Sequence, residues 1–179
     1  NLDDDEDTPF QLEHGIVSDV GSQSPMTVVL QNSYVSPVII SNPNYSETEV
    51  PAVVRIDNVT GTSFDIWMEN PSGVAVSNRN VHYVVVEQGA FTLPDGTKLE
   101  AFTFESTVTD HSASWNGHSL AFVNSYTTPV VLGQVMSSND DWSVFWSRSE
   151  ASPYNLPGGS TFRAGLHVGE DSDTTRTTE

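Results

Sequence analysis

The sequence predicts an all-β fold made of two tandem antiparallel β-sandwich units, of which the second lacks its final strand. Three observations support this prediction. Short apolar stretches, rich in β-branched and aromatic residues, alternate with turn segments of Gly, Pro, Asn and Ser. No segment keeps a helical periodicity over three turns. Part of the sequence recurs in the same order further along the chain.

The strand candidates of the first half are each bounded by turn residues. In one of them Phe64, Ile66 and Met68 alternate with Asp65 and Trp67. Since successive side chains of a strand point to opposite faces, we expect the first three in the core. The candidates are 27–30, 37–40, 53–56, 64–68 and 81–87.

An internal repeat links the two halves of the chain. Residues 32–38 read NSYVSPV, and residues 124–130 read NSYTTPV. Two shorter matches flank this one in the same order. The distance along the chain between matching residues grows from the first match to the last, as loop insertions between matching strands would produce. The flanking matches are Leu12-Glu13 with Leu99-Glu100, and Phe64 in Gly-Thr-Ser-Phe with Phe162 in Gly-Ser-Thr-Phe.

The repeat divides the chain into an acidic tail, residues 1–8, a first unit, 9–92, and a second unit, 93–179. A turn signal, Leu-Pro-Asp-Gly-Thr, marks the boundary between the units. The first unit ends with its most strand-like segment, 81–87, whose counterpart would fall just past residue 179. The second unit is therefore expected to be incomplete, either by truncation or because a neighbour supplies its last strand.

The motifs VVLQNSYVSPVIIS, VVRIDNVTGTSFDIWM and VHYVVVEQG, in this order, resemble the H-type lectins, typified by snail agglutinins and the C-terminal domain of discoidins. This resemblance implies a six-stranded antiparallel sandwich, often trimeric, that binds galactose or N-acetylgalactosamine without catalysis. The sugar contacts of the family do not carry over. The loop that holds an Arg-Asp pair in the family has only Asp19 here, Pro51 replaces an expected arginine, and an expected histidine falls near Ser72.

The charge balance excludes several partners. The chain has 24 acidic residues against six lysines and arginines, and its net charge is −18. Such a surface repels nucleic acid and anionic membranes, and it favours solubility in concentrated salt, which indicates a marine or halophilic source. There is no cysteine, so disulfides and thiol chemistry are excluded. We expect no membrane insertion, because no apolar run is long enough to span a bilayer.

The best candidate for a ligand-binding edge is an aromatic and acidic cluster in the second half. Sugars are bound by flat aromatic faces together with carboxylates or amides that receive their hydroxyl groups. The alternative is that Trp142 and Trp146 belong to a core face, and that Trp115 packs over a sandwich end. The candidate ligand-binding residues are Trp115, His118, Asp140, Asp141, Trp142 and Arg148.

Metal and modification sites are weakly indicated. Asp171 and Asp173 offer the oxygen ligands that calcium prefers, without the spacing of an EF-hand loop, so a solvated acidic loop is the alternative. The five histidines have no metal-ligand spacing. No other cofactor is expected. Asn44 and Asn58 stand in Asn-x-Ser/Thr sequons and are candidate glycosylation sites.

The sequence predicts a binding protein and not an enzyme. No nucleophile elbow occurs, and nothing brings Glu69 and Glu87 together as a glycosidase pair. The first hypothesis is a non-catalytic, lectin-like protein of carbohydrate binding or adhesion, located outside the cell or on a cell or virion surface. The alternative is a structural subunit of a filament, appendage or virion that self-associates by β-strand complementation between neighbours.

Overall fold

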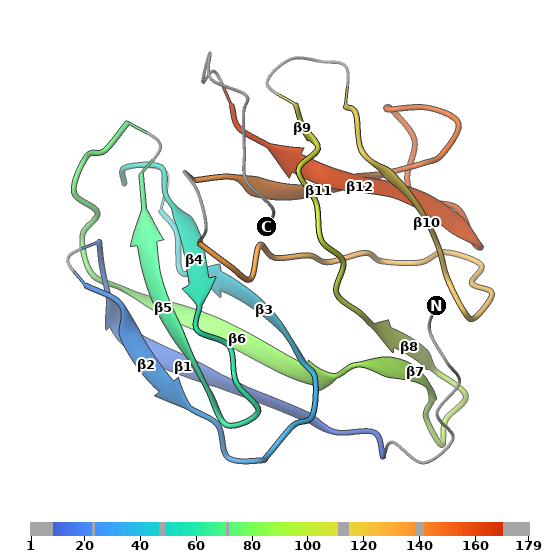
Figure 1. Ribbon diagram of the computed structural model, residues 1–179, viewed down its shortest axis with the longest axis horizontal. Helices are drawn as coiled ribbons and strands as arrows, with labels where there is room; N and C mark the ends of the chain where they lie inside the picture. The colour runs from blue at the N-terminus through green and yellow to red at the C-terminus, as the bar shows by residue number, and fades with distance from the viewer. Residues whose placement is uncertain are drawn as a thin grey trace.

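The structure is a computed structural model that describes residues 9–169, apart from residues 23, 47–48, 71, 111–114 and 139–141. The described residues form β-strands and no helix, which confirms the all-β prediction (Figure 1). The strands make several small sheets, and nearly all of the pairings are antiparallel. Within this part of the chain, no helix is long and apolar enough to cross a membrane.

The N-terminal half, residues 9–92, contains two three-stranded antiparallel sheets that share one core. The strand order is β1-β6-β3 in one sheet and β2-β5-β4 in the other. Five of these strands coincide with the strand candidates from the sequence, and β1 is the strand that was not among the candidates. The bounds are β1 Leu12–Val20, β2 Met26–Val29, β3 Pro37–Pro43, β4 Val53–Asp57, β5 Ser63–Glu69 and β6 Arg79–Glu87.

The core of this half is built from strand faces of both sheets. Phe64, Ile66 and Met68 are 0% exposed, as the alternation in β5 predicts. Tyr83 of β6 packs edge-on against Phe64, with the ring centroids 5.5 Å apart. Tyr83 lies opposite Gly15 of β1, where a Cβ would stand 2.5 Å from the tyrosine hydroxyl. The glycine therefore makes room for the tyrosine ring.

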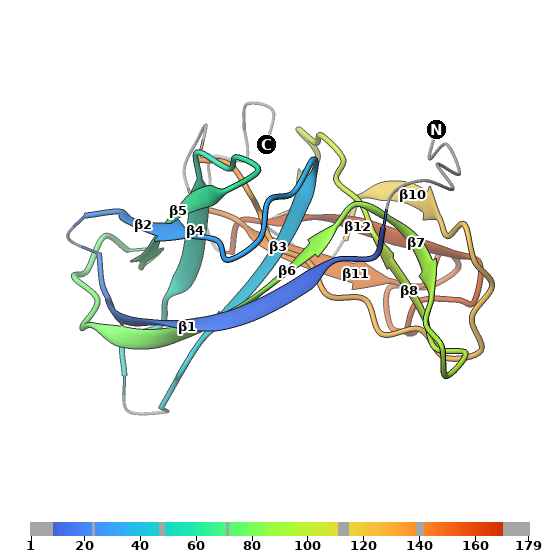
Figure 2. The ribbon, with the colours of Figure 1, turned by 90° about the horizontal axis from the view of Figure 1, so that it is seen from below.

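The C-terminal half, residues 93–169, contains one sheet of order β10-β12-β11, with the short strand β9 pairing in parallel with β12. A hairpin of β7 and β8 follows β6 and lies on the side of the C-terminal half (Figures 1 and 2), and the predicted unit boundary falls in its turn. The bounds are β7 Gly89–Thr92, β8 Lys98–Ala101, β9 Thr109–Asp110, β10 His118–Ala121, β11 Val144–Arg148 and β12 Thr161–His167.

A glutamate holds the same loop in each half. The Glu13 carboxylate accepts hydrogen bonds from the backbone amides of residues 31–32, at 2.9 to 3.1 Å. The Glu100 carboxylate does the same for the amides of residues 123–124. These are the two glutamates that the sequence comparison pairs. The carboxylates satisfy amides that would otherwise lack a partner at the start of the Asn-Ser-Tyr motif.

The tyrosine of that motif meets a glycine in each half. The amide of Tyr34 donates to the carbonyl of Gly61 at 2.7 Å, and the amide of Tyr126 donates to that of Gly159 at 2.8 Å. A Cβ at either glycine would lie only 2.2 or 2.1 Å from the tyrosine carbonyl oxygen. The close approach explains why glycine stands before Thr-Ser-Phe and Ser-Thr-Phe.

A third contact recurs at the far end of the first strand. The Met68 amide donates to the carbonyl of Gly21 at 3.0 Å, and the Leu166 amide donates to that of Val108 at 3.4 Å. Gly21 and Val108 are the same number of residues apart as Glu13 and Glu100. Met68 and Leu166 are the same number of residues apart as Phe64 and Phe162. The segment after β8 therefore runs the course that β1 takes in the N-terminal half, from Glu100 to Val108.

The excess of negative charge predicts a strong dependence of stability on salt. Three arginines pair with carboxylates in the described part of the chain, but the sequence has 24 acidic residues against six lysines and arginines, so negative charges repel one another. Raising the salt from about 0.1 M to about 1 M shortens the Debye length from about 10 to about 3 Å and screens this repulsion. The melting temperature, measured by circular dichroism, should rise by several degrees, whereas an equal osmolality of sucrose should raise it less. A melting temperature that falls with added potassium chloride would contradict this expectation.

Candidate functional site

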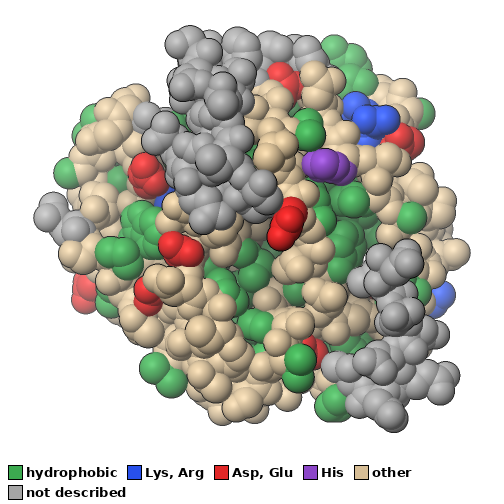
Figure 3. Space-filling view, viewed as in Figure 1, with side chains coloured by type: hydrophobic (Ala, Val, Ile, Leu, Met, Phe, Trp, Pro, Cys, Tyr) green, Lys and Arg blue, Asp and Glu red, His purple; other side chains and the backbone are tan. Residues whose placement is uncertain are grey.

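A groove with a volume of about 860 Å³ is lined by the C-terminal half and by Val38, Ile40, Val84 and Val86 of β3 and β6. One wall is residues 99–106, which follow the course of β1, and another is residues 130–137, which continue the second Asn-Ser-Tyr motif. Its floor is apolar, and hydrophobic side chains gather in a hollow on the face seen in Figure 3. Lining side chains include Phe102, Phe104, Phe122, Val131, Phe145 and Leu166.

Both walls of the groove are extended segments without a strand partner. Residues 102–107 alternate between inward and exposed side chains, as a strand does, yet belong to no sheet. Neither their backbone groups nor those of residues 129–133 make a hydrogen bond to any described residue. In the N-terminal half the matching segments are β1 and β3, and β6 lies between them and pairs with both. The groove therefore lies where the other half has its central strand.

The groove also lacks a carboxylate that the N-terminal half has. The Glu87 side chain at the end of β6 is 4% exposed and accepts hydrogen bonds from the amides of Val35 and Ser36, at 2.7 and 2.6 Å. The matching amides are those of Thr127 and Thr128. Neither donates to any acceptor in the described ranges.

A second candidate site is the aromatic cluster beside β11 and β12. The Trp115 ring makes an edge contact with Trp146, with centroids 5.6 Å apart, and lies over His167 at 4.9 Å. Gly117 and Gly165 leave room for the Trp146 ring, since a Cβ on either would lie 2.7 or 2.9 Å from it. The rings of Trp115 and His167 are half-buried, so part of each is open to solvent.

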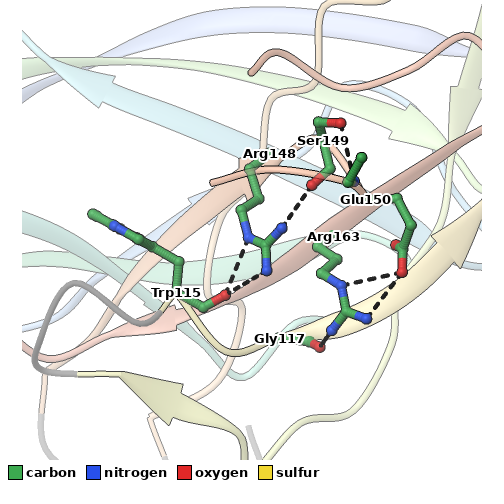
Figure 4. Close-up of polar contacts among 7 residues, drawn as sticks. Trp115, Gly117, Arg148, Ser149, Glu150 and Arg163 are labelled. Carbon is green, nitrogen blue, oxygen red and sulfur yellow. Dashed lines mark hydrogen bonds and ion pairs between the residues drawn. The ribbon is translucent and has the colours of Figure 1, made fainter. Parts of the chain in front are cut away.

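Arg148 holds this cluster in place and is not a free ligand (Figure 4). Its guanidinium donates two hydrogen bonds to the Trp115 carbonyl, both at 3.1 Å, and one to that of Ser149 at 2.7 Å. Trp115 has a φ of 50°, in the region that bulky side chains rarely adopt, so the arginine stabilises a strained turn. Beside it, Arg163 bridges Glu150 at 2.9 Å and the Gly117 carbonyl.

The other predicted ligand-binding residues are dispersed. His118 lies on β10, where Nε2 stands 2.9 Å from the Ser106 hydroxyl and the ring meets Phe104 edge-on. Trp142 packs over Gly169. Asp140 and Asp141 lie outside the described residues. The structure thus brings Trp115 and Arg148 together and leaves His118 with different neighbours.

The predicted metal and modification sites remain predictions. Asp171 and Asp173 lie outside the described residues, and no group of three metal-ligating side chains occurs among the residues that are described. Asn44 and Asn58 are both exposed. The Asn58 side-chain amide donates to the Asp65 carboxylate at 2.8 Å.

Tyr126 predicts how the stability of the C-terminal half depends on alkaline pH. Burial, followed by the Glu100 carboxylate, raises the pKa of Tyr126 from 10.0 to about 12. The folded state thus favours the protonated phenol. Its stabilising contribution is complete below the unfolded pKa and is lost as the pH rises through about 12. The free energy of unfolding, measured by urea titration, should fall less steeply between about pH 10 and about pH 12 in Tyr126→Phe than in the wild type. Tyr154→Phe, on an exposed ring, is the control and should keep the wild-type slope; two identical slopes would refute the assignment.

Comparison with known proteins gives one distant relative. The chain is 32% identical over 138 residues to halomucin of Haloquadratum walsbyi, and the match covers 72% of this chain. It spans only 2% of the length of halomucin. No family model matches the chain, and no solved structure matches it. The resemblance to H-type lectins therefore stays a prediction.

The candidate residues chosen by chemical type, Trp115, His118, Trp142 and Arg148, do not line the groove, which consists of backbone edges and an apolar floor. The sequence signal that points to its walls is the internal repeat, since both walls match strands of the N-terminal half, β1 and β3.

Proposed function

We propose that this chain is a non-catalytic module of an extracellular surface protein, with a structural and adhesive role. The observation that carries the proposal is the similarity to a segment of halomucin, whose name classes it with the mucins. The acidic surface supports it, because a net charge of −18 suits a protein exposed to concentrated salt.

In this proposal the module consists of two tandem β-sandwich units, and the second lacks its final strand. The argument rests on the three recurring contacts made by Glu13 and Glu100, by the tyrosines of the motif and by Met68 and Leu166. The strand order also recurs, because β2-β5-β4 in the N-terminal half corresponds strand by strand to β10-β12-β11 in the C-terminal half. Duplicated units are typical of large proteins that extend a surface by repetition.

The experiment that tests this role is surface labelling of intact cells that make the protein. An antibody raised against residues 9–169 should label unbroken cells held in concentrated salt, and added protease should remove the label. A label that appears only after the cells are lysed would contradict the proposal. An antibody against a cytoplasmic enzyme of the same cells controls for leakage.

Glycan binding is the second candidate function, and the aromatic cluster favours it. Trp115 and His167 have half-buried rings with centroids 4.9 Å apart, and aromatic faces of this kind pack against the C–H surface of a sugar. Binding on a glycan array in concentrated salt should be lost in Trp115→Ala, which keeps the backbone carbonyl that Arg148 binds. Trp67→Phe, on β5 of the other half, is the control and should bind as wild type. An array without signal above background would exclude this candidate.

A further inference from the structure

We infer that a polar cleft between the two halves is a binding site for a small neutral molecule rich in hydroxyl groups. The cleft has a volume of about 190 Å³. Its walls are residues 41–43 of β3, 52–54 at the start of β4, 133–135, and 143–145 at the start of β11. Trp115 is not among its lining residues, and the inference depends neither on the aromatic cluster nor on the proposed surface role.

Hydrogen bonds between the halves fix the walls of the cleft. The Gln134 side-chain amide donates to the Val54 carbonyl at 2.9 Å, and its oxygen accepts from the Ser41 hydroxyl at 2.8 Å. Four residues further on, the Ser138 hydroxyl donates to the Asp57 carboxylate at 2.8 Å. The segment 134–138 is thus attached to β3 and β4. A ligand that enters a site with walls already in place loses little free energy to their ordering.

A buried hydroxyl group in the cleft has no partner. Ser143 lines the cleft and is 3% exposed, and its hydroxyl makes no hydrogen bond within the part of the chain that the structure describes. Leaving a buried hydroxyl unpaired is costly, and such groups are rare in native proteins. A ligand hydroxyl can donate to this group or accept from it, and would remove the cost.

The neighbouring polar groups also match a hydroxyl group. Both protons of the Gln134 amide are used, by the carbonyls of Val54 and Val135, but its oxygen and that of Ser41 keep free lone pairs. Asn42 is exposed, and its side chain makes no hydrogen bond to a described residue. The cleft therefore presents free acceptors beside a free donor. A hydroxyl group, which donates one hydrogen bond and accepts two, is complementary to both.

Charge and size narrow the class of ligand. No charged side chain lies among the described lining residues, so an ion would lose its hydration without gaining a counter-charge. Val53, Val144 and Phe145 offer apolar surface to the C–H groups of a carbon chain or ring. A space of this size holds about six water molecules, or a polyol of about three to six carbon atoms. The ligand class is therefore a neutral polyol or a single sugar ring.

The test titrates the full chain, in concentrated salt, with glycerol, sorbitol and methyl glucopyranoside. Binding is followed by the NMR signals of the side-chain amides of Asn42 and Gln134, which should shift and saturate with at least one probe. Ser143→Ala should weaken binding about tenfold, and Asn42→Ala about fivefold. Ser143→Ala should fold as stably as the wild type without ligand, because its hydroxyl has no partner to lose.

Three controls accompany these variants. Ser119→Ala, the same change at an exposed position of β10, should keep the wild-type affinity. Trp115→Ala should also keep it, which separates the cleft from the glycan candidate at the aromatic cluster. Glycerol 3-phosphate carries the charge that the cleft cannot neutralise, and it should bind at least about tenfold more weakly than glycerol.

The probes distinguish two sources of the same chemistry. Tighter binding of glycerol or sorbitol identifies a dissolved polyol as the ligand, whereas tighter binding of the pyranoside identifies a terminal sugar of a glycan. A cleft that holds water only, seen as no saturable shift with any probe, would overturn the inference. Equal affinity of Ser143→Ala and wild type, or of glycerol 3-phosphate and glycerol, would overturn it as well. Surface labelling of intact cells is unaffected by any of these results, so the two proposals fail separately.

Discussion

Phe64→Ala should destabilise the N-terminal half by about 3–5 kcal/mol, and the matching Phe162→Ala should cost about 2 kcal/mol. Phe64 is 0% exposed in a closed core, so its removal leaves a cavity that adds to the lost transfer free energy. Phe162 is 2% exposed but borders the groove, so removing it only enlarges a space that is already open.

This pair is measured by urea unfolding followed by tryptophan fluorescence. Trp67 reports on the N-terminal half, and Trp115, Trp142 and Trp146 report on the other. One variant replaces Trp67 by Phe, and another replaces the other three tryptophans by Phe. Each variant keeps the fluorescence of one half, so each unfolding transition can be assigned to its half. Phe10→Ala, at a ring that is 40% exposed, is the control and should cost little. Equal losses for Phe64→Ala and Phe162→Ala would mean that the second core is as closed as the first.

Glu87→Ala should destabilise the N-terminal half by about 3 kcal/mol or more. The carboxylate is buried and accepts from three backbone amides, and the variant would leave those of Val35 and Ser36 without an acceptor. The measurement is again the free energy of unfolding in urea, at neutral pH. Glu105→Ala, at an exposed carboxylate on the wall of the groove, is the control. A loss for Glu87→Ala below about 1 kcal/mol would show that water replaces the carboxylate at no cost.

Much of the N-terminal half could be predicted from the sequence. Its apolar stretches are short, β-branched and bounded by turn residues, and the alternation at Phe64, Ile66 and Met68 identified a core face that is fully buried. The strand β1 was harder to predict, because LEHGIVSDV carries charged residues and a glycine that the fold requires opposite Tyr83.

The C-terminal half was less predictable because a strand depends on its partner. Residues 102–107 alternate as a strand would, yet they are not part of a sheet because they have no backbone partner among the described residues. The candidate ligand-binding residues were chosen by chemical type, which cannot reveal that Arg148 is engaged by the Trp115 carbonyl. Backbone partners of this kind are set by the tertiary fold.

The central claim is that the extended segments 102–107 and 129–133 have no backbone partner in the described part of the chain, and amide hydrogen exchange tests it most directly. Four pairs of matching amides are compared in the native chain: Gly15 with Phe102, Val17 with Phe104, Val38 with Val130, and Ile40 with Leu132. The first amide of each pair faces β6 and should exchange slowly, with a protection close to that of global unfolding of its half. The second should exchange nearly as fast as in an unfolded chain. Equal protection within the pairs would contradict the account.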